Sequence, residues 1–318
     1  MKVSACNRYG VTFNRIPSAH GWRAMMNFKG VIPALVTPLD ENERVKVDVL
    51  RDLIEYLIGK GADGFYVGGA TGEGINLRIE ERERLCEHAV AAVDGRVPVI
   101  VQVAAGNIYD VIRLAKHAEA SGANSVSATA PLFFKYTEED IYNYYKAISD
   151  AVHVPVMIYY NPNAGFNFTA DFVARMFREI ENVTAIKWTS SSYHEMIRLK
   201  DLTNGEMNII NGPDEMLLMG LMAGADGGIG TTYNIIFDEI KEIYTSFRLG
   251  DLQGAQNAQK RADRIIHSLV KNATIPATKA VLERMGFAVG NATFPMRRYT
   301  ESEKDIIFSD LLKAGLKT

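Results

Sequence analysis

Short apolar runs alternate with amphipathic segments along most of the chain. Eight of these runs indicate buried strands, at 31–36, 65–67, 97–103, 125–130, 154–160, 183–189, 207–210 and 227–230. The segments between them place apolar residues at helical spacing, as Val47, Leu50 and Leu53 do. Helices are therefore predicted at 47–60, 78–93, 109–120, 137–152, 170–180, 193–202, 214–222 and 237–249.

Turn signals support this alternation. The segments 61–64, 122–125 and 224–227 each begin Gly-Ala-Asp or Gly-Ala-Asn, follow a predicted helix and precede a predicted strand. Thr137 and Asp140 form a box-like helix start. Eight such units in about 220 residues predict a (β/α)8 TIM barrel of the α/β class. A doubly wound open sheet is the alternative, but the chain has no dinucleotide fingerprint.

The pattern divides the chain into three parts. Residues 27–250 form the predicted barrel, and 251–318 form a helical extension with helices at 253–271, 277–285 and 301–316. Residues 1–26 contain no Asp or Glu and no apolar block, which excludes a secretory signal. We interpret them as a disordered leader or as residues added by cloning, with Met25 or Met26 as the natural start, and an organelle transit peptide is the alternative.

Composition narrows the class of protein. The 318 residues are 47% hydrophobic with a formal net charge of −3, so neither nucleic acid nor a membrane is an expected partner. Two cysteines, Cys6 and Cys86, cannot form a disulfide framework, which favours a reducing compartment, the cytoplasm. The six histidines never pair at metal-ligand spacing, so we expect no metal or other cofactor.

Lys187 is the first candidate for chemistry because it ends an apolar strand. In a barrel, reactive groups lie at the rim, meaning the C-terminal ends of the strands and the loops that follow them. A lysine there can extend its ammonium to water as a structural residue. It can also form a Schiff base with a carbonyl substrate. The absence of a metal site favours the second interpretation, since an iminium supplies the electron sink.

Three other stretches fall at the same rim. The loop 68–74 is rich in glycine and can hold an anion with its backbone amides, or be a turn without a ligand. The strand 154–160 ends in two tyrosines, which can transfer protons or fill space. Asp214 and Glu215 can cap a helix or accept hydrogen bonds from substrate hydroxyls.

Together these stretches resemble the pyruvate-dependent class I aldolases, the superfamily of dihydrodipicolinate synthase and N-acetylneuraminate lyase. The resemblance extends from residue 27 to the C-terminus and rests on the Gly-Gly-x-Thr-Gly-Glu loop and the strand that ends in lysine. The runs 211–215 and 223–234 resemble the N-acetylneuraminate lyase branch in particular.

The resemblance implies roles for individual residues. Lys187 would form the Schiff base, and Tyr159 would be the general acid and base, with Tyr160 as the alternative. The pyruvate carboxylate would bind at Ala70, Thr71 and Gly72. The sugar-derived part of the substrate would contact Thr189, Gly212, Asp214, Glu215 and Thr231. The family also implies a homotetramer.

Three departures from the family pattern bear on these roles. Ala70 stands where relatives usually carry Ser or Thr, so one hydroxyl of the proton relay is missing. Phe133 lies where many relatives have a tyrosine that reaches across a subunit contact. Asn163 and Ala164 occupy the loop that carries an arginine in dihydrodipicolinate synthases, which argues against a dicarboxylic product.

The resemblance implies a Schiff-base aldolase that cleaves N-acetylneuraminate to N-acetylmannosamine and pyruvate. Two alternatives stay open. The first keeps the Schiff base and changes the aldehyde, as in a 2-keto-3-deoxy sugar acid aldolase or a dihydrodipicolinate synthase. The second is a non-catalytic ligand-binding relative, which only Ala70 and the missing tyrosine support.

Overall fold

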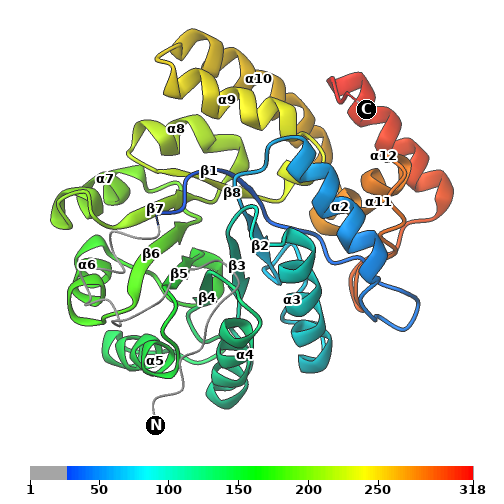
Figure 1. The fold of residues 1–318 in the computed structure, drawn as a ribbon. Coiled ribbons are helices and arrows are strands. Elements are labelled where there is room, and N and C mark those ends of the chain that lie inside the picture. The colour runs from blue at the N-terminus through cyan, green and yellow to red at the C-terminus, as the bar shows by residue number, and fades with distance from the viewer. Residues whose placement is uncertain (1–26, 318) are drawn as a thin grey trace.

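Eight parallel strands alternate with helices and close into a barrel (Figure 1). The computed structural model describes residues 27–317. The strands are β1 Gly30–Pro33, β2 Phe65–Val67, β3 Val99–Gln102, β4 Ser125–Thr129, β5 Val156–Tyr160, β6 Val183–Trp188, β7 Asn208–Asn211 and β8 Gly227–Gly230. Each strand pairs with its neighbours in chain order, β8 pairs with β1, and a bridge between Ala34 and Tyr66 joins β1 to β2. The predicted TIM barrel is confirmed.

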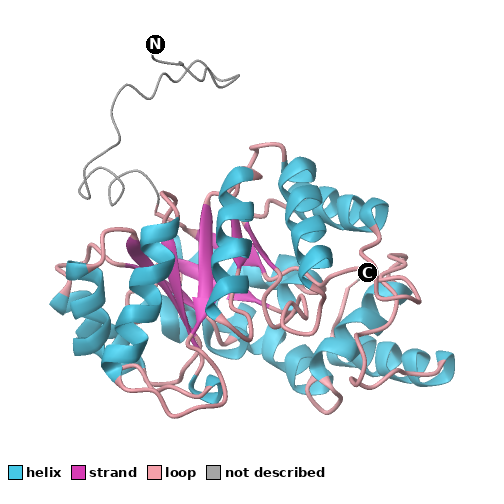
Figure 2. Ribbon diagram, turned by 90° about the horizontal axis from the view of Figure 1, so that it is seen from below, coloured by secondary structure: helices cyan, strands magenta, loops and turns pink. Residues whose placement is uncertain are grey.

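Helices surround the strands on the outside (Figure 2). They are α2 Val47–Gly59, α3 Ile79–Val93, α4 Ile108–Ala120, α5 Glu138–Ala151, α6 Ala170–Glu179, α7 Tyr193–Leu202, α8 Leu217–Met222 and α9 Phe237–Arg248. Three more follow the barrel: α10 Leu252–Leu269, α11 Thr274–Arg284 and α12 Glu301–Ala314. Among residues 27–317, no helix has the length and apolar character that a bilayer crossing requires.

One predicted helix is wrong in form. The segment predicted as a helix at 214–222 is a 3-10 turn, η2 Asp214–Met216, followed by the short helix α8. The side chain of Asp214 bonds Thr232 after β8 and accepts no capping hydrogen bond from η2 or α8. The prediction for residues 1–26 lies outside the described residues.

The three predicted turns do more than reverse the chain. Gly61, Gly122 and Gly224 have positive φ angles of 90°, 93° and 98°, which favour glycine. The acidic or amide residue two positions later accepts a hydrogen bond from the preceding strand in the barrel. Asp63 accepts from Val31 at 2.8 Å, Asn124 from Val99 at 2.8 Å, and Asp226 from Ile209 at 3.0 Å. Each turn therefore fastens two neighbouring strands at their N-terminal ends.

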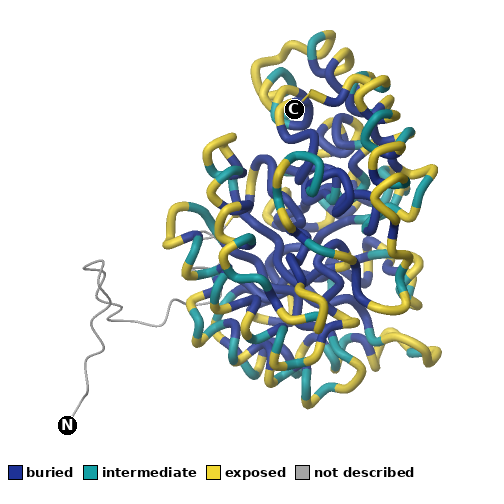
Figure 3. The backbone as a smooth tube through the Cα atoms, turned by 90° about the vertical axis from the view of Figure 1, so that its right-hand side faces the viewer, coloured by how far each residue is buried: buried dark blue, intermediate teal, exposed yellow. Residues whose placement is uncertain are grey.

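The apolar core has two layers. The barrel interior is a separate cluster of Phe28, Ile32, Ala34, Tyr66, Ile100, Met157, Tyr159, Ala185, Ile210 and Ile229. The second layer lies between strands and helices and continues into the C-terminal helices, through Ile265, Leu282 and Leu311 (Figure 3). Alternation along each strand therefore decides which side chains reach the interior.

The C-terminal helices also contact the rim. Lys279 of α11 forms an ion pair of 2.6 Å with Glu73 in the loop after β2, and both side chains are buried. Gln259 of α10 accepts from Leu218 N–H at 3.0 Å and donates to the carbonyl of Asp214 at 3.2 Å. The helices that follow the barrel thus hold two of its rim loops in place.

Candidate active site

Lys187 lies at the rim end of β6, enclosed in the barrel interior. Its side chain is 5% exposed. Its Nζ lies 4.3 Å from the ring centroid of Tyr159 and 4.7 Å from that of Tyr66. Among residues 27–317, no carboxylate lies within 4.0 Å of this nitrogen. The amine is therefore held against two aromatic faces without a counter-ion, unlike a lysine that extends to water.

The two tyrosines at the end of β5 point in opposite directions. Tyr159 pairs in register with Lys187 and belongs to the interior cluster. Tyr160 belongs to the outer layer, where its ring packs 4.9 Å from that of Trp188 and its hydroxyl donates to Asn167. Only the first of these two tyrosines faces the lysine.

The glycine-rich loop after β2 presents free donors. The N–H groups of Ala70, Thr71 and Gly72 have no hydrogen-bond acceptor among residues 27–317, whereas those of Glu73 and Gly74 bond back within the turn. The helix α3 begins at Ile79, so these donors belong to the turn and not to a helix N-terminus. Consecutive free amides of this kind form an anion-binding concavity.

Thr71 connects this loop to the other side of the rim. Its hydroxyl lies 2.7 Å from the hydroxyl of Thr231, which follows β8. The side chain of Thr71 is buried, whereas Ala70 is exposed. The structure therefore brings Thr71 and Thr231 together and leaves the methyl group of Ala70 outside this contact.

Asp214 is a buried carboxyl in the same region. It accepts hydrogen bonds from the N–H and the hydroxyl of Thr232, at 2.7 and 2.6 Å. Burial raises its pKa to about 6, and these hydrogen bonds and the charge of Lys187 oppose that rise. A Cβ at Gly230 would lie 2.2 Å from Asp214 Oδ1, so the carboxyl requires glycine there.

Thr189 and Gly212 are in contact with each other. A Cβ at Gly212 would lie 2.0 Å from Thr189 Oγ1, a buried hydroxyl that has no hydrogen-bond partner among residues 27–317. Glu215, next to the buried Asp214, is exposed.

Two residues of the site, Tyr66 and Ser127, were not predicted from the sequence. Tyr66 is fully buried in the barrel interior, and its hydroxyl donates to Ser127 Oγ at 3.0 Å. The one signal in the sequence was a tyrosine in the apolar strand 65–67, next to the glycine-rich loop. The ion pair of Glu73 could not be predicted from the sequence either, since its partner Lys279 lies far along the chain.

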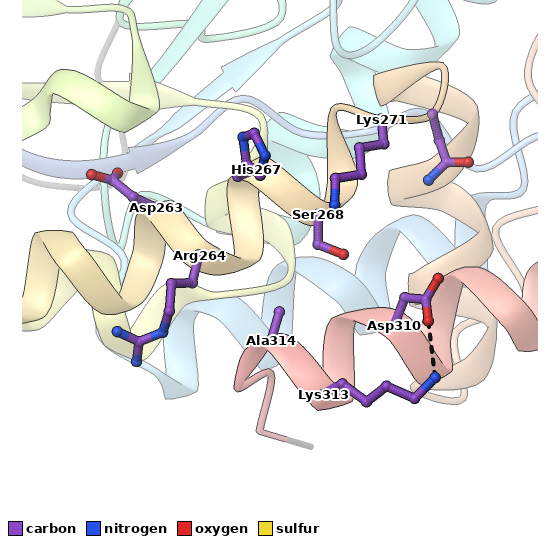
Figure 4. A pocket seen from close by; sticks show the side chains of 9 residues that line it. Asp263, Arg264, His267, Ser268, Lys271, Asp310, Lys313 and Ala314 are labelled. Atoms are coloured by element: carbon purple, nitrogen blue, oxygen red, sulfur yellow. Dashed lines mark hydrogen bonds and ion pairs between the residues drawn. The ribbon is translucent and has the colours of Figure 1, made fainter.

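Two negative findings delimit the site. Among residues 27–317, no group of three His, Cys, Asp or Glu side chains is arranged to hold a metal ion. A surface cleft of about 860 Å³ lies between α10 and α12 and mixes acidic with basic side chains (Figure 4). Lys313 and Asp310 pair there at 3.1 Å. Nothing in this cleft resembles a reactive constellation.

Comparison with known proteins places the chain in a family. The sequence model of the dihydrodipicolinate synthetase family matches residues 27–314. N-acetylneuraminate lyase of Rhizobium meliloti is 31% identical over 87% of this chain and 92% of its own length. A 4-hydroxy-tetrahydrodipicolinate synthase of Oceanobacillus iheyensis is also 31% identical, over 87% of this chain and 94% of its own.

Solved structures give the same result. Proteus mirabilis N-acetylneuraminate lyase superposes with a TM-score of 0.88 at 29% identity, covering 92% of this chain and 100% of that one. Dihydrodipicolinate synthase of Bacillus anthracis superposes with a TM-score of 0.86 at 30% identity, with the same coverage. The chain therefore belongs to the dihydrodipicolinate synthetase family, whose members are pyruvate-dependent class I aldolases and synthases.

Proposed function

We propose that this protein is an aldolase that cleaves N-acetylneuraminate to N-acetylmannosamine and pyruvate, reversibly, through a Schiff base on Lys187. The observation that carries the proposal is the enclosure of Lys187 Nζ against Tyr159 and Tyr66, with no carboxylate within ion-pair distance among residues 27–317. A desolvated amine at the rim of a barrel is suited to attack a ketone.

The first half of the mechanism forms the iminium. The neutral amine of Lys187 adds to the C2 carbonyl of the open-chain sugar acid. Tyr159 donates its proton to the hydroxyl of the resulting carbinolamine, which leaves as water, and the nitrogen keeps its one proton and carries the positive charge. The free amides of the loop at Ala70, Thr71 and Gly72 bind the adjacent carboxylate, which fixes the C2 carbon opposite Nζ.

The second half breaks the carbon–carbon bond. The proton of the C4 hydroxyl is removed by Tyr159 as phenolate, or by the substrate carboxylate, which passes it to Tyr159. The C3–C4 bond then breaks, its electron pair passes to the iminium, and an aldehyde leaves an enamine on Lys187. Protonation of C3 and hydrolysis release pyruvate and the free lysine. Because Ala70 supplies no hydroxyl, the hydrogen-bonded hydroxyls of Thr71 and Thr231 take its place in this proton transfer.

The polar side chains beyond the lysine favour a polyhydroxylated substrate. In this proposal Asp214, Glu215 and Thr231 accept and donate hydrogen bonds to the hydroxyl chain, while Thr189 and Gly212 lie beside the N-acetyl end. The buried carboxyl of Asp214 supports this assignment, since its oxygens are already oriented by Thr232. Asn163 and Ala164, in the turn η1 Pro162–Ala164 after β5, offer no cation for a second carboxylate.

A second candidate keeps the lysine and changes the aldehyde. The synthase of Oceanobacillus iheyensis is as similar to this chain as the lyase of Rhizobium meliloti is, at 31% identity. Pyruvate release from N-acetylneuraminate should therefore be compared with release from a 2-keto-3-deoxy sugar acid, and with condensation of pyruvate and aspartate semialdehyde. Turnover of either alternative substrate at a higher kcat/KM would replace the proposed reaction. The absence of turnover with every 2-keto acid would favour a non-catalytic relative.

Borohydride trapping tests the Schiff base directly. We expect the intact mass to rise by one reduced pyruvate adduct in the wild type and in Lys313→Ala, whose lysine is exposed on α12. We expect no adduct in Lys187→Ala. An adduct of equal yield in Lys187→Ala would show that the mechanism is wrong.

A matched pair of tyrosine variants tests the proton transfer. Tyr159→Phe should still trap pyruvate but lose roughly 10²-fold or more in kcat, because general acid–base catalysis contributes on that order. Tyr160→Phe faces the outer layer and should keep kcat within about threefold of the wild type, since its ring packing survives. Equal losses in the two variants would contradict the role of Tyr159.

The proposal includes a cytoplasmic homotetramer that needs no cofactor. Cys86 is buried, and burial raises its pKa to about 12, which is compatible with a structural thiol in a reducing compartment. The exposed loop residues Leu132, Phe133 and Phe134 give an assembly an apolar surface to cover, with Phe133 93% exposed. Light scattering measures the oligomeric state.

A further inference from the structure

We propose that Tyr66 is a positioning residue for Lys187, and that the face of its ring stabilises the lysine nitrogen as the iminium cation of the pyruvate adduct. This inference rests on the proposed Schiff-base function and extends it to a residue outside the proton-transfer steps. In this proposal Tyr66 shifts the equilibrium between free pyruvate and the covalent adduct toward the adduct.

The position of the lysine nitrogen is the first argument. Nζ lies 4.7 Å from the centroid of Tyr66, within the distance of about 6 Å at which a ring face attracts a cation. The rings of Tyr66 and Tyr159 meet edge to face, with centroids 6.0 Å apart and planes 81° apart. The nitrogen therefore faces two rings from different directions. No carboxylate among residues 27–317 lies within 4.0 Å of this nitrogen.

The second argument is that the ring of Tyr66 is held in one orientation. Its hydroxyl donates to Ser127 Oγ at 3.0 Å, and its side chain is fully buried. A Cβ at Gly69 would lie 2.4 Å from Tyr66 Cε1, so the glycine-rich loop packs directly on the ring edge. A ring fixed at both its hydroxyl and its edge presents the same face to Nζ throughout the reaction.

Tyr66 and Tyr159 have different roles in this proposal. The hydroxyl of Tyr66 is committed to Ser127, and burial raises the pKa of this phenol well above its ordinary value, so it remains protonated. No hydrogen bond occupies the hydroxyl of Tyr159 among residues 27–317, which leaves it available for the substrate. Tyr66 thus acts through its π face, and Tyr159 acts through its oxygen.

The test varies the π face without varying the shape. Tyr66 is replaced by phenylalanine and then by mono-, di- and trifluorinated phenylalanines, which keep the ring and progressively weaken its attraction for a cation. Two constants are measured on the full chain for each variant. One is the apparent dissociation constant of pyruvate from borohydride-trapped adduct, and the other is the inhibition constant of lactate, which carries the carboxylate but no ketone.

We expect the pyruvate constant to rise stepwise with fluorination, to a total of about 3- to 30-fold, because a desolvated cation–π contact contributes on that order. Tyr66→Phe itself should stay within about threefold of the wild type, while Tyr66→Leu should match the most fluorinated ring. The lactate constant should stay within about twofold across the series, since lactate forms no cation on Lys187.

The matched control is Tyr299, another buried tyrosine with a cation on its ring. Arg297 lies 4.8 Å above it, and its hydroxyl accepts from the N–H of Ala273 at 3.0 Å. Tyr299→Leu should lower thermal stability without changing the pyruvate constant. A pyruvate constant that is flat across the fluorinated series, in a wild type that traps pyruvate on Lys187, overturns the role of Tyr66 alone. A wild type that traps no pyruvate overturns the proposed function as well.

Discussion

Among single residues of the candidate site, Asp214 joins deep burial to a shifted pKa. Burial raises the pKa of this carboxyl from 3.8 to about 6, since charging a group away from water is unfavourable. Because the folded-state pKa lies above the unfolded value, the protonated carboxyl stabilises the fold at low pH. That stability is lost as the pH rises from about 4 through 6.

Asp214→Asn removes this titration and keeps the hydrogen bonds of Thr232, since an amide oxygen accepts as a carboxylate oxygen does. We expect the variant to gain roughly 2 kcal/mol in free energy of unfolding relative to the wild type between pH 4.5 and 7.5. Denaturant unfolding at the two pH values measures the difference. Asp310→Asn, on the exposed surface of α12, should show less than about 1 kcal/mol of such a change. Parallel pH profiles for Asp214→Asn and the wild type would contradict the prediction.

The sequence was informative about single residues where a pattern constrained them. A strand that ends in lysine beside a predicted rim was enough to single out Lys187. The choice between Tyr159 and Tyr160 needed the strand register, because a shift of one residue moves a side chain to the opposite face. Tyr66 was missed because its importance depends on the distance to a lysine on another strand, which no local pattern contains.

At the scale of elements, the turns between helices and strands were predicted to reverse the chain, and in the structure they also bond a neighbouring strand. Glycine after each helix and Asp or Asn two residues later were expected to reverse the chain. In the structure the Asp or Asn side chain also bonds the neighbouring strand, as Asn124 does with Val99. The boundary at 214–222 was wrong because Asp214 bonds a residue of a different element, and helical spacing alone cannot reveal such a contact.

The ion pair between the loop after β2 and α11 gives an element-scale prediction. Burial lowers the pKa of Lys279, and the carboxylate of Glu73 opposes that shift. Lys279→Met would leave the Glu73 carboxylate buried with the N–H of Thr293 as its one remaining donor among residues 27–317. We expect a loss of about 3–5 kcal/mol in free energy of unfolding, because a buried charge would lack its counter-ion. Chemical denaturation measures it.

A double variant separates the lost ion pair from the lost volume. Glu73→Gln combined with Lys279→Met should recover part of the stability that Lys279→Met loses, since no uncompensated charge remains. Lys313→Met breaks the exposed pair with Asp310 and should change the unfolding free energy by less than about 1 kcal/mol. A double variant that is less stable than Lys279→Met would contradict this account.

At the scale of the whole molecule, the hydrophobic periodicity of the sequence was enough to predict the barrel. It was not enough to predict how the last three helices pack against the barrel. Alternation of strands and helices predicted eight units in the correct order. The sequence analysis divided the chain near residue 250, as a barrel with an extension. Apolar side chains of α10 and α11 nevertheless join the same outer core layer as the barrel helices. Contacts between segments far apart in the chain decide this point, and a local pattern does not record them.

These contacts predict that the barrel, residues 27–250, does not fold independently of the C-terminal helices. A chain of residues 27–250 would lose Gln259, which holds Leu218 and the carbonyl of Asp214, and Lys279, which neutralises Glu73. It would also expose the face of α9 that packs on α10. We expect this chain to show no cooperative thermal transition by circular dichroism and to trap no pyruvate. A chain of residues 27–318 should unfold cooperatively and should trap pyruvate. A cooperative transition in the shorter chain would show that the barrel is an independent domain, and that the C-terminal helices support the two rim loops without being needed for folding.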